Sequence, residues 1–486
     1  MHIVNELDAK ILSTFKKVDE VKITKALDKE LIKLNKKIVV LDDDPTGIQT
    51  VHNVSVYTDW SKASIKAGFA EKNNMFFILT NSRGLTSEES NRLHIEIAKN
   101  IQEISNETNK DYILISRSDS ILRGHYPLET DVLKKTIEGI SDKKFDAEII
   151  CPFLKEGGRF TIGNVHYVHY DDVLVPAGKT EFARDKTFGY TSSHLGDWIE
   201  EKTKGEFKRE DAIYISLESL RNMNINKIKE DLMKVKDFNK IVVNAIDYID
   251  IKIFSLALVE AILEGKRFMI RSAAAITKVL GNISDKELLT RKELVNNNEN
   301  GGIIVIGSYT EKTTKQFNEL SKLPSIKLIE FNSDLVRDKV KLEQEIQRVI
   351  AECERKIKSG ITVSVYTKRT PLELKNDDKD DALKASIKIS DGVTAIVKGI
   401  TTKPSFIIAK GGITSSEIGT KALGVKRAKV LGQIKPGIPV WQTDEQSKFS
   451  TMPYVIFPGN VGEDTTLKEI AEILMRERGD GNVSQP

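Results

Sequence analysis

The sequence predicts an α/β protein of two domains, each a mostly parallel sheet flanked by helices, with a helical extension at the N-terminus. Its 486 residues exceed the roughly 100–200 of a typical domain, so at least two hydrophobic cores are expected. From Lys37 onward, short β-branched runs alternate with amphipathic helical stretches, a pattern typical of parallel sheets covered by helices. A polar segment, NNNENGG at 296–302, divides this alternation into two series and indicates a domain boundary.

The composition is that of a globular protein with a balanced surface charge. Hydrophobic residues make up 40% and charged residues 30%, which suffices to bury a core. The formal net charge of +3 is too small to indicate a nucleic-acid surface. The two cysteines, Cys151 and Cys353, stand far apart and are interpreted as buried apolar side chains. Because the N-terminus lacks a signal-peptide pattern and no run of about eighteen apolar residues occurs, we expect a cytoplasmic protein without membrane contact.

The N-terminal extension covers residues 1–35, where apolar residues at helical spacing over 4–33 predict helices. The first domain covers 36–290. Its expected strands are 37–41, 54–58, 75–80, 112–116, 147–151, 241–245 and 267–271. A capping box of Thr86 and Glu89 begins a helix. After Pro152, a Gly-rich and aromatic segment predicts hairpins in place of another βα unit.

The second domain covers 300–476 and repeats the alternation of strands and helices. Strands are expected at 302–310, 361–367 and 405–412, and helices near 334–359 and 380–400. In such sheets ligands bind at the carboxyl ends of the strands, where loops and helix N-termini converge. Motifs in those loops therefore carry the most information about function.

The first strand ends in three consecutive carboxylates, Asp42, Asp43 and Asp44. Three carboxylates at one strand end repel each other unless a cation or several hydroxyl donors share the site. We therefore interpret them as a polyol, metal or proton-acceptor site, with Asp43 or Asp44 as the catalytic carboxylate. The alternative is an Asx-turn or a helix cap, which Asp also favours.

Three arginines follow later strands of the same series: Arg83, Arg117 and Arg123. Parallel strands place them at one edge of the sheet, where guanidinium groups can hold a carboxylate through paired hydrogen bonds. Asp119, between Arg117 and Arg123, suits the hydroxyls of a small hydroxy acid. The alternative is a set of solvated arginines or a purely structural ion pair.

Three strand ends in the second domain carry glycines, at 306–310, 410–417 and 458–463. Glycine lets backbone N–H groups approach phosphate oxygens, and nearby Ser or Thr adds hydroxyl donors. Each loop alone is weak evidence for a phosphate site, because glycine is also common wherever a strand ends. Three such loops on one edge of a sheet indicate a nucleotide site. No Walker A sequence and no protein-kinase motif set occurs.

Taken together, these motifs resemble those of the four-carbon acid sugar kinase family. A DDxTG pattern at a strand end matches Asp43, Asp44, Thr46 and Gly47. A DSTLRG pattern followed by a glutamate matches residues 119–124, where Ile121 replaces the threonine, and Glu129. The C-terminal half of the family carries three loops, which match here Gly307, Ser308, Gly411, Gly412, Thr414, Ser415, Gly459, Asn460 and Gly462.

The resemblance implies that the N-terminal domain binds a sugar acid and the C-terminal domain binds ATP, with Mg²⁺ bridging the phosphates. With the strand-end reasoning above, we assign Asp42, Arg83, Arg117, Asp119 and Arg123 to the acid. The nucleotide would lie on Ser308, Gly411, Gly412, Thr414, Ser415, Gly459, Asn460 and Gly462.

The leading hypothesis is a kinase that phosphorylates a hydroxyl of threonate, erythronate or 3-oxo-tetronate. Two alternatives are a non-catalytic nucleotide or metabolite sensor, and a metal-dependent glycosyl transferase that uses Asp42 and Asp44. The expected partners are a small sugar acid and ATP, with neither nucleic acid nor membrane. The sequence leaves the metal ligands and the oligomeric state open, a homo-oligomer included.

Overall fold

The structure is a computed structural model that describes residues 4–295, 298–308, 310–369, 379–459 and 461–475. The chain divides into two compact units, unit 1 (Met1–Asp285) and unit 2 (Lys286–Pro486). Each unit is built on a mostly parallel sheet flanked by helices, which confirms the predicted fold class. Over the described ranges, no helix is long and apolar enough to cross a membrane.

Unit 1 contains an all-parallel sheet whose strand order is β10-β11-β6-β12-β5-β2-β4-β3. The strands are β10 (Ile213–Ile215), β11 (Asn239–Val243), β6 (Ala147–Cys151), β12 (Phe268–Ser272), β5 (Tyr112–Arg117), β2 (Lys37–Asp42), β4 (Met75–Leu79) and β3 (Ser55–Tyr57). Every residue of β2, β4, β5, β6 and β12 is buried, which explains their nearly continuous apolar sequences.

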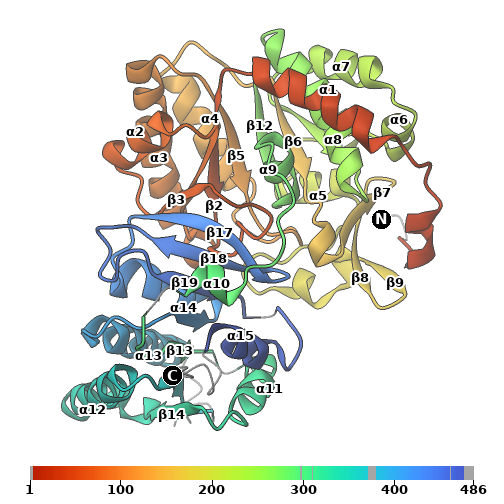
Figure 1. The fold of residues 1–486 in the computed structure, drawn as a ribbon. Helices are drawn as coiled ribbons and strands as arrows, with labels where there is room; N and C mark the ends of the chain where they lie inside the picture. The colour runs from red at the N-terminus through yellow and green to blue at the C-terminus, as the bar shows by residue number, and fades with distance from the viewer. Residues whose placement is uncertain (1–3, 296–297, 309, 370–378, 460, 476–486) are drawn as a thin grey trace, which may run out of the picture. The chain divides into compact units, whose positions relative to one another are not determined.

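Helices cover both faces of this sheet (Figure 1). One face carries α2 (Lys62–Ala70), α3 (Ser87–Thr108) and α4 (Leu128–Gly139), which pack on one another. The other carries α1 (Glu20–Lys33), α7 (Ile225–Lys234) and α8 (Tyr248–Leu263). The capping box predicted from Thr86 and Glu89 begins α3. The remaining helices of unit 1 are α5 (Leu195–Lys202), α6 (Leu217–Arg221) and α9 (Ala275–Leu280).

The hairpins predicted after Pro152 are present as a second, antiparallel sheet with the order β1-β9-β8-β7. Its strands are β1 (Leu7–Asp8), β9 (Val173–Pro176), β8 (Val165–Tyr170) and β7 (Arg159–Ile162). The expectation of helix throughout 4–33 was therefore wrong at its beginning. Residues 7 and 8 are extended because they pair with the edge strand β9, and only a 3₁₀ turn at Ala9–Ser13 separates them from the linker to α1.

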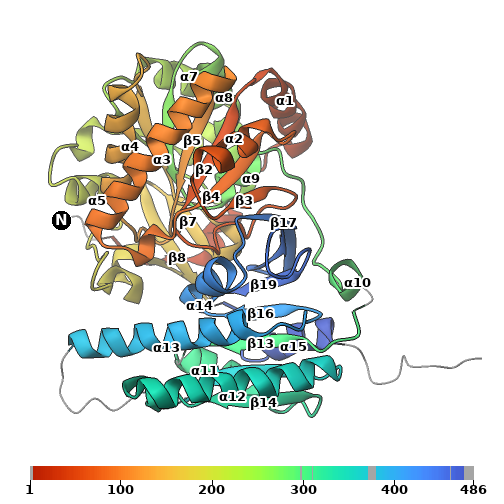
Figure 2. The ribbon, with the colours of Figure 1, turned by 90° about the vertical axis from the view of Figure 1, so that its left-hand side faces the viewer.

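Unit 2 has the strand order β17-β18-β19-β16-β13-β15-β14, in which β18 is antiparallel to both of its neighbours, β17 and β19, and the pairs from β19 to β14 are parallel. The strands are β17 (Arg427–Lys435), β18 (Ile438–Thr443), β19 (Pro453–Phe457), β16 (Ile407–Lys410), β13 (Ile303–Ile306), β15 (Thr362–Thr367) and β14 (Ile326–Phe331). The helices are α10 (Arg291–Leu294), α11 (Glu311–Leu320), α12 (Lys339–Lys358), α13 (Lys379–Gly399), α14 (Gly412–Glu417) and α15 (Thr466–Leu474). The long helices α12 and α13 lie side by side (Figure 2), and α11 packs on α15 (Figure 1).

Candidate functional sites

Neighbouring strands of unit 1 end in charged residues at the same edge of the sheet. Asp42, the last residue of β2, is the register partner of Arg117, the last residue of β5. Asp43 and Asp44 follow directly, and Arg83 lies in a 3₁₀ turn after β4, on the other side of β2. The structure thus brings three predicted aspartates and two predicted arginines into one cluster.

Asp43 lies at the centre of this cluster. Its Oδ1 accepts hydrogen bonds from Arg83 Nη2 at 2.6 Å and Arg117 Nη1 at 3.4 Å. Its Oδ2 accepts from Arg83 Nε at 3.2 Å and from the Ser118 hydroxyl at 2.5 Å. The side chain is only 2% exposed. Because both oxygens are engaged and shielded, Asp43 fixes the positions of the two arginines.

Asp42 is as buried as Asp43, and its pKa is unusually high for an aspartate. Arg117 Nη1 donates to its Oδ1 at 2.8 Å. Burial raises the pKa of Asp42 to about 7, and the attraction of Arg117 offsets this only in part. The backbone of Gly47 packs directly against Asp42, since a Cβ at this position would lie only 2.2 Å from the Asp42 carboxylate. Asp42 is therefore a poorly accessible group that titrates near neutral pH.

Asp44 differs from the other two because its side chain is 20% exposed. Its Oδ1 accepts from the Thr46 backbone N–H at 2.8 Å and the Thr46 hydroxyl at 2.6 Å, and Arg83 Nη1 lies 3.3 Å from its Oδ2. Burial acts to raise the pKa of Asp44, but Arg83 and the Thr46 hydrogen bonds outweigh it and hold the pKa below its usual value. Asp44 is thus an ionised carboxylate that a ligand can reach.

Arg123 and Asp119 form a pair beside this cluster. Arg123 Nε donates to Asp119 Oδ2 at 2.6 Å, and its Nη1 lies 3.8 Å from Asp185. The guanidinium stands 5.2 Å from the centre of the Phe182 ring and the side chain is 22% exposed, against 4% for Arg117. Burial acts to raise the pKa of Asp119, but Arg83 and then Arg123 lower it below the usual value. Arg83 therefore acts electrostatically on both Asp119 and the aspartate cluster.

Sequence reasoning missed Arg271, which reaches the cluster from β12. Its Nη1 donates to Ser116 at 2.8 Å and to Glu129, and its Nη2 donates to Ser118 at 2.8 Å. Gly124 has a φ of +122°, and a Cβ there would lie 2.7 Å from the Ser118 hydroxyl and 2.9 Å from Arg271. An arginine in the expected strand 267–271 indicates that a buried carboxylate partner exists, but the sequence does not show which residue it is.

In unit 2, the three glycine loops follow the adjacent parallel strands β13, β16 and β19. The first two are in close contact, because a Cβ at Gly307 would lie 2.4 Å from Thr414 Oγ1. Gly411 has a φ of +121°, and its Cβ would lie 3.5 Å from the Cβ of Ser308. At Gly459, by contrast, a Cβ would meet no atom of the described residues within 4 Å, so the backbone there borders space that these residues leave open.

The hydroxyl-bearing residues of these loops differ in their hydrogen bonds. Ser415 donates to the Ala409 carbonyl at 2.8 Å and is buried, so it stabilises the loop itself. The Ser308 hydroxyl lies 3.4 Å from the Thr310 hydroxyl. Gly462, with a φ of +82°, packs against Thr466. Asn460 lies outside the described residues.

Sequence reasoning also missed two cations beside these loops. Lys410 ends β16 and its Nζ donates to the carbonyls of Pro458 at 2.6 Å and Gly459 at 3.1 Å. Arg369 donates to the Ser308 carbonyl at 2.6 Å and to the Thr314 hydroxyl at 2.7 Å. Both side chains tie loops together. In the part of the chain that the structure describes, no group of three His, Cys, Asp or Glu residues could hold a metal ion.

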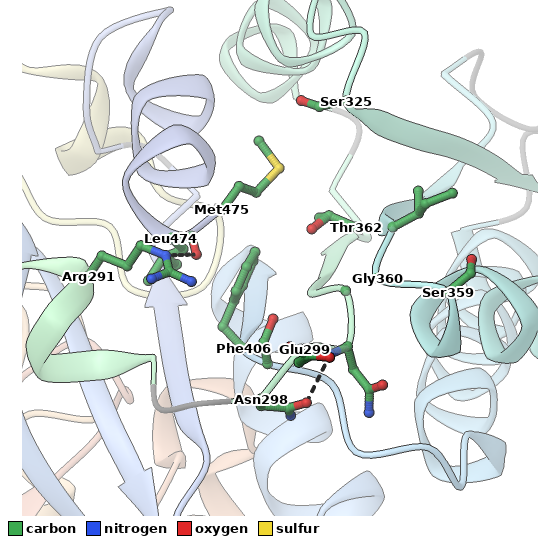
Figure 3. Close-up of a pocket in the computed structure, with 14 residues that line it drawn as sticks. Arg291, Asn298, Glu299, Ser325, Ser359, Gly360, Thr362, Phe406, Leu474 and Met475 are labelled. Carbon is green, nitrogen blue, oxygen red and sulfur yellow. Dashed lines mark hydrogen bonds between the residues drawn. The ribbon is translucent and has the colours of Figure 1, made fainter. Parts of the chain in front are cut away.

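Unit 2 also contains a pocket of about 300 Å³ (Figure 3). It is lined by residues just before β13, β15 and β16, among them Gly301, Ile361 and Phe406, and Arg291 at its edge donates to the Leu474 carbonyl at 3.2 Å. These are the amino ends of the strands. The pocket is therefore separate from the glycine loops, which lie at the carboxyl ends.

Comparison with known families gives a match for each unit. Residues 38–280 match a model described as a sugar-binding N-terminal domain, and residues 303–467 match one described as a nucleotide-binding C-terminal domain. The chain therefore belongs to the family whose members combine these two domains. The two domains fit the four-carbon acid sugar kinase family, to which the sequence motifs pointed.

Solved structures show the same fold at low sequence identity. A Haemophilus influenzae protein of the DUF1537 family is 18% identical with a TM-score of 0.57, over 89% of this chain and 99% of its own. A Salmonella typhimurium protein described as a putative tRNA synthase is 13% identical with a TM-score of 0.65, over 90% of this chain and 100% of its own. None of the curated proteins matches this sequence.

Proposed function

We propose that this protein is an ATP-dependent kinase that phosphorylates a hydroxyl of a four-carbon sugar acid of the threonate, erythronate or 3-oxo-tetronate type. The sugar-binding and nucleotide-binding family domains support the two ligand classes. Phosphoryl transfer depends on positioning and charge neutralisation more than on a covalent intermediate. The charged groups of unit 1 and the glycine loops of unit 2 suit these two requirements.

In unit 1, Arg123 binds the carboxylate of the acid, because it is the more exposed end of the Arg123–Asp119 pair. Asp119 and Asp44 accept hydrogen bonds from the hydroxyls. Arg83, Arg117 and Asp42 complete the acid site by fixing these carboxylates in place.

For the proton acceptor we propose Asp44, held in position by Asp43 through their shared partner Arg83. Asp44 is ionised and 20% exposed, whereas Asp43 is 2% exposed and has both oxygens engaged. A proton acceptor must come within hydrogen-bond distance of the hydroxyl that attacks phosphorus. This accessible carboxylate is the observation that carries the proposal.

In unit 2, the phosphates of ATP lie on Ser308, Gly411, Gly412, Thr414, Ser415, Gly459, Asn460 and Gly462. The open space beside Gly459 allows an oxygen to approach the backbone, as a phosphate cradle requires. Mg²⁺ arrives with the nucleotide, because Mg²⁺ in such sites is held by substrate phosphates and few protein carboxylates. When bound, it neutralises charge on the phosphates.

The deciding experiment is a coupled assay for ADP release with Mg·ATP and threonate, erythronate or 3-oxo-tetronate. We expect acid-dependent ADP release with at least one of them, and ³¹P NMR of the product identifies the hydroxyl. Binding of ATP without turnover of any acid would favour a sensor. Consumption of a nucleotide sugar in place of ATP would favour a glycosyl transferase.

A further inference from the structure

Lys410 is a fully buried lysine between two of the glycine loops. It is the last residue of β16 and directly precedes Gly411, and its side chain runs along β19 beside its register partner Phe457. The ammonium lies 4.0 Å from the centre of the Phe457 ring and donates to the carbonyls of Pro458 and Gly459. One side chain thus joins the loop after β16 to the loop after β19.

This ammonium has hydrogen-bond acceptors, but the described residues give it no counter-charge. Among the described residues, no carboxylate forms an ion pair with Lys410, and the charged group whose field reaches it is Lys312 at the beginning of α11. Burial and, to a smaller extent, the repulsion from Lys312 together lower the pKa of Lys410 to about 7. A buried cation without a partner is costly unless a ligand supplies the missing negative charge.

We propose that Lys410 is a positioning residue for the nucleotide, which holds the Pro458–Gly459 turn against the Gly411 loop and supplies a positive charge that the bound polyphosphate balances. This inference rests on the proposed function, since it assumes that the phosphates lie on these loops. It follows that a bound nucleotide favours the charged form of Lys410. Binding therefore takes up protons from solution at neutral and mildly alkaline pH.

The experiment is titration calorimetry of the full chain with Mg·ADP at pH 8, in Tris and in HEPES, whose ionisation enthalpies differ. The difference in heat gives the number of protons taken up. We expect proton uptake by the wild-type protein and by Lys315→Met, which removes an exposed lysine from α11. Lys410→Met should take up fewer protons and bind about tenfold more weakly. One charge acting over ~6 Å at a dielectric near 20 is worth about 100-fold, and protonating a group of pKa about 7 at pH 8 costs about tenfold of this.

The wild-type protein also provides a test that needs no variant. Its affinity for Mg·ADP should fall as pH rises from 7 to 9, by up to about tenfold per pH unit. Constant affinity over this range, or equal proton uptake by wild type and a folded Lys410→Met, overturns the role of Lys410 while the nucleotide site stands. No binding of Mg·ADP by the wild-type protein overturns the nucleotide site itself, and the inference with it.

Discussion

The carboxyl edge of the unit 1 sheet gathers Asp42, Asp43 and Asp44 with Arg83 and Arg117, and these side chains bond to one another, although the buried Nε of Arg117 has no hydrogen-bond partner among the described residues. The corresponding edge of unit 2 carries glycines, hydroxyls and the buried Lys410, without a carboxylate partner for that lysine among the described residues. Unit 1 presents side chains, as recognition of a particular acid requires. Unit 2 presents backbone, as recognition of a phosphate chain requires. Substitutions in unit 1 should therefore change stability, kcat or KM for the acid, whereas substitutions in unit 2 should change KM for ATP.

The largest effect should come from the centre of the unit 1 cluster. Asp43→Asn removes the charge that compensates Arg83 and Arg117 in a buried position, so we expect the free energy of unfolding to fall by about 3 kcal/mol. Urea denaturation followed by circular dichroism measures this. Asp185→Asn, which removes a partly exposed carboxylate of the same unit, should cost less than about 1 kcal/mol. Equal stability of Asp43→Asn and wild type would show that the cluster is not structural.

A catalytic effect of similar size should appear at Asp44 without loss of stability. Asn caps and turns as well as Asp, so Asp44→Asn keeps the local fold but loses the proton acceptor. We expect kcat to fall by about 10²-fold or more, while KM for ATP changes little. Steady-state kinetics of the coupled assay measures both constants. A variant with nearly wild-type kcat would remove Asp44 from the mechanism.

Arg123→Gln should separate the two ligands. Loss of the guanidinium should raise KM for the acid by about 30-fold, equivalent to about 2 kcal/mol, because a charge-assisted pair with the substrate carboxylate is lost. KM for ATP should stay the same. Arg209→Gln, which breaks another arginine–aspartate pair of unit 1, is the matched control. A parallel loss for both ligands would indicate a folding defect.

Gly459→Leu tests the backbone site of unit 2. A Cβ at this position would lie within 4 Å of no atom in the described part of the chain, so the fold should tolerate a side chain there. The added carbons would occupy the space for the phosphates, and we expect KM for ATP to rise about tenfold or more. Gly139→Leu, where a Cβ also meets nothing, should leave both KM and the thermal midpoint unchanged. Normal ATP kinetics in Gly459→Leu would place the nucleotide elsewhere.

The smallest effect is a dependence of stability on pH. The pKa of Asp42 is about 7 in the folded protein, well above its ordinary value, so the folded state binds a proton that the unfolded state has lost. The free energy of unfolding should therefore fall as pH rises, by about 1 kcal/mol between pH 6 and pH 8. Asp42→Asn should lose that part of the slope. Denaturation curves at both pH values decide this, and identical slopes in the two proteins would contradict the assignment.

The fold and the positions of the main motifs could be predicted from sequence because buried parallel strands have nearly continuous apolar sequences. That pattern located β2, β4 and β5, and hence the shared edge of Asp42 and Arg117. It could not locate β1, because two residues carry no periodicity and become extended only by pairing with β9. Arg271 and Lys410 were missed for a different reason. Both lie in strands, and their partners come from segments that only the tertiary fold brings near.

The hydrogen bonds that several side chains share with Asp43 limit which substitutions could change the acid that this protein accepts. Arg83, Arg117 and Ser118 all bond to one carboxylate, so changes among them should be strongly non-additive, and single-site libraries there would mostly return unfolded proteins. Phe182, which packs on the Arg123 guanidinium, is not one of these partners. Because we propose that Arg123 binds the carboxylate that every acid carries, randomising Phe182 while keeping Arg123 and the aspartate cluster is the shorter route to new acids.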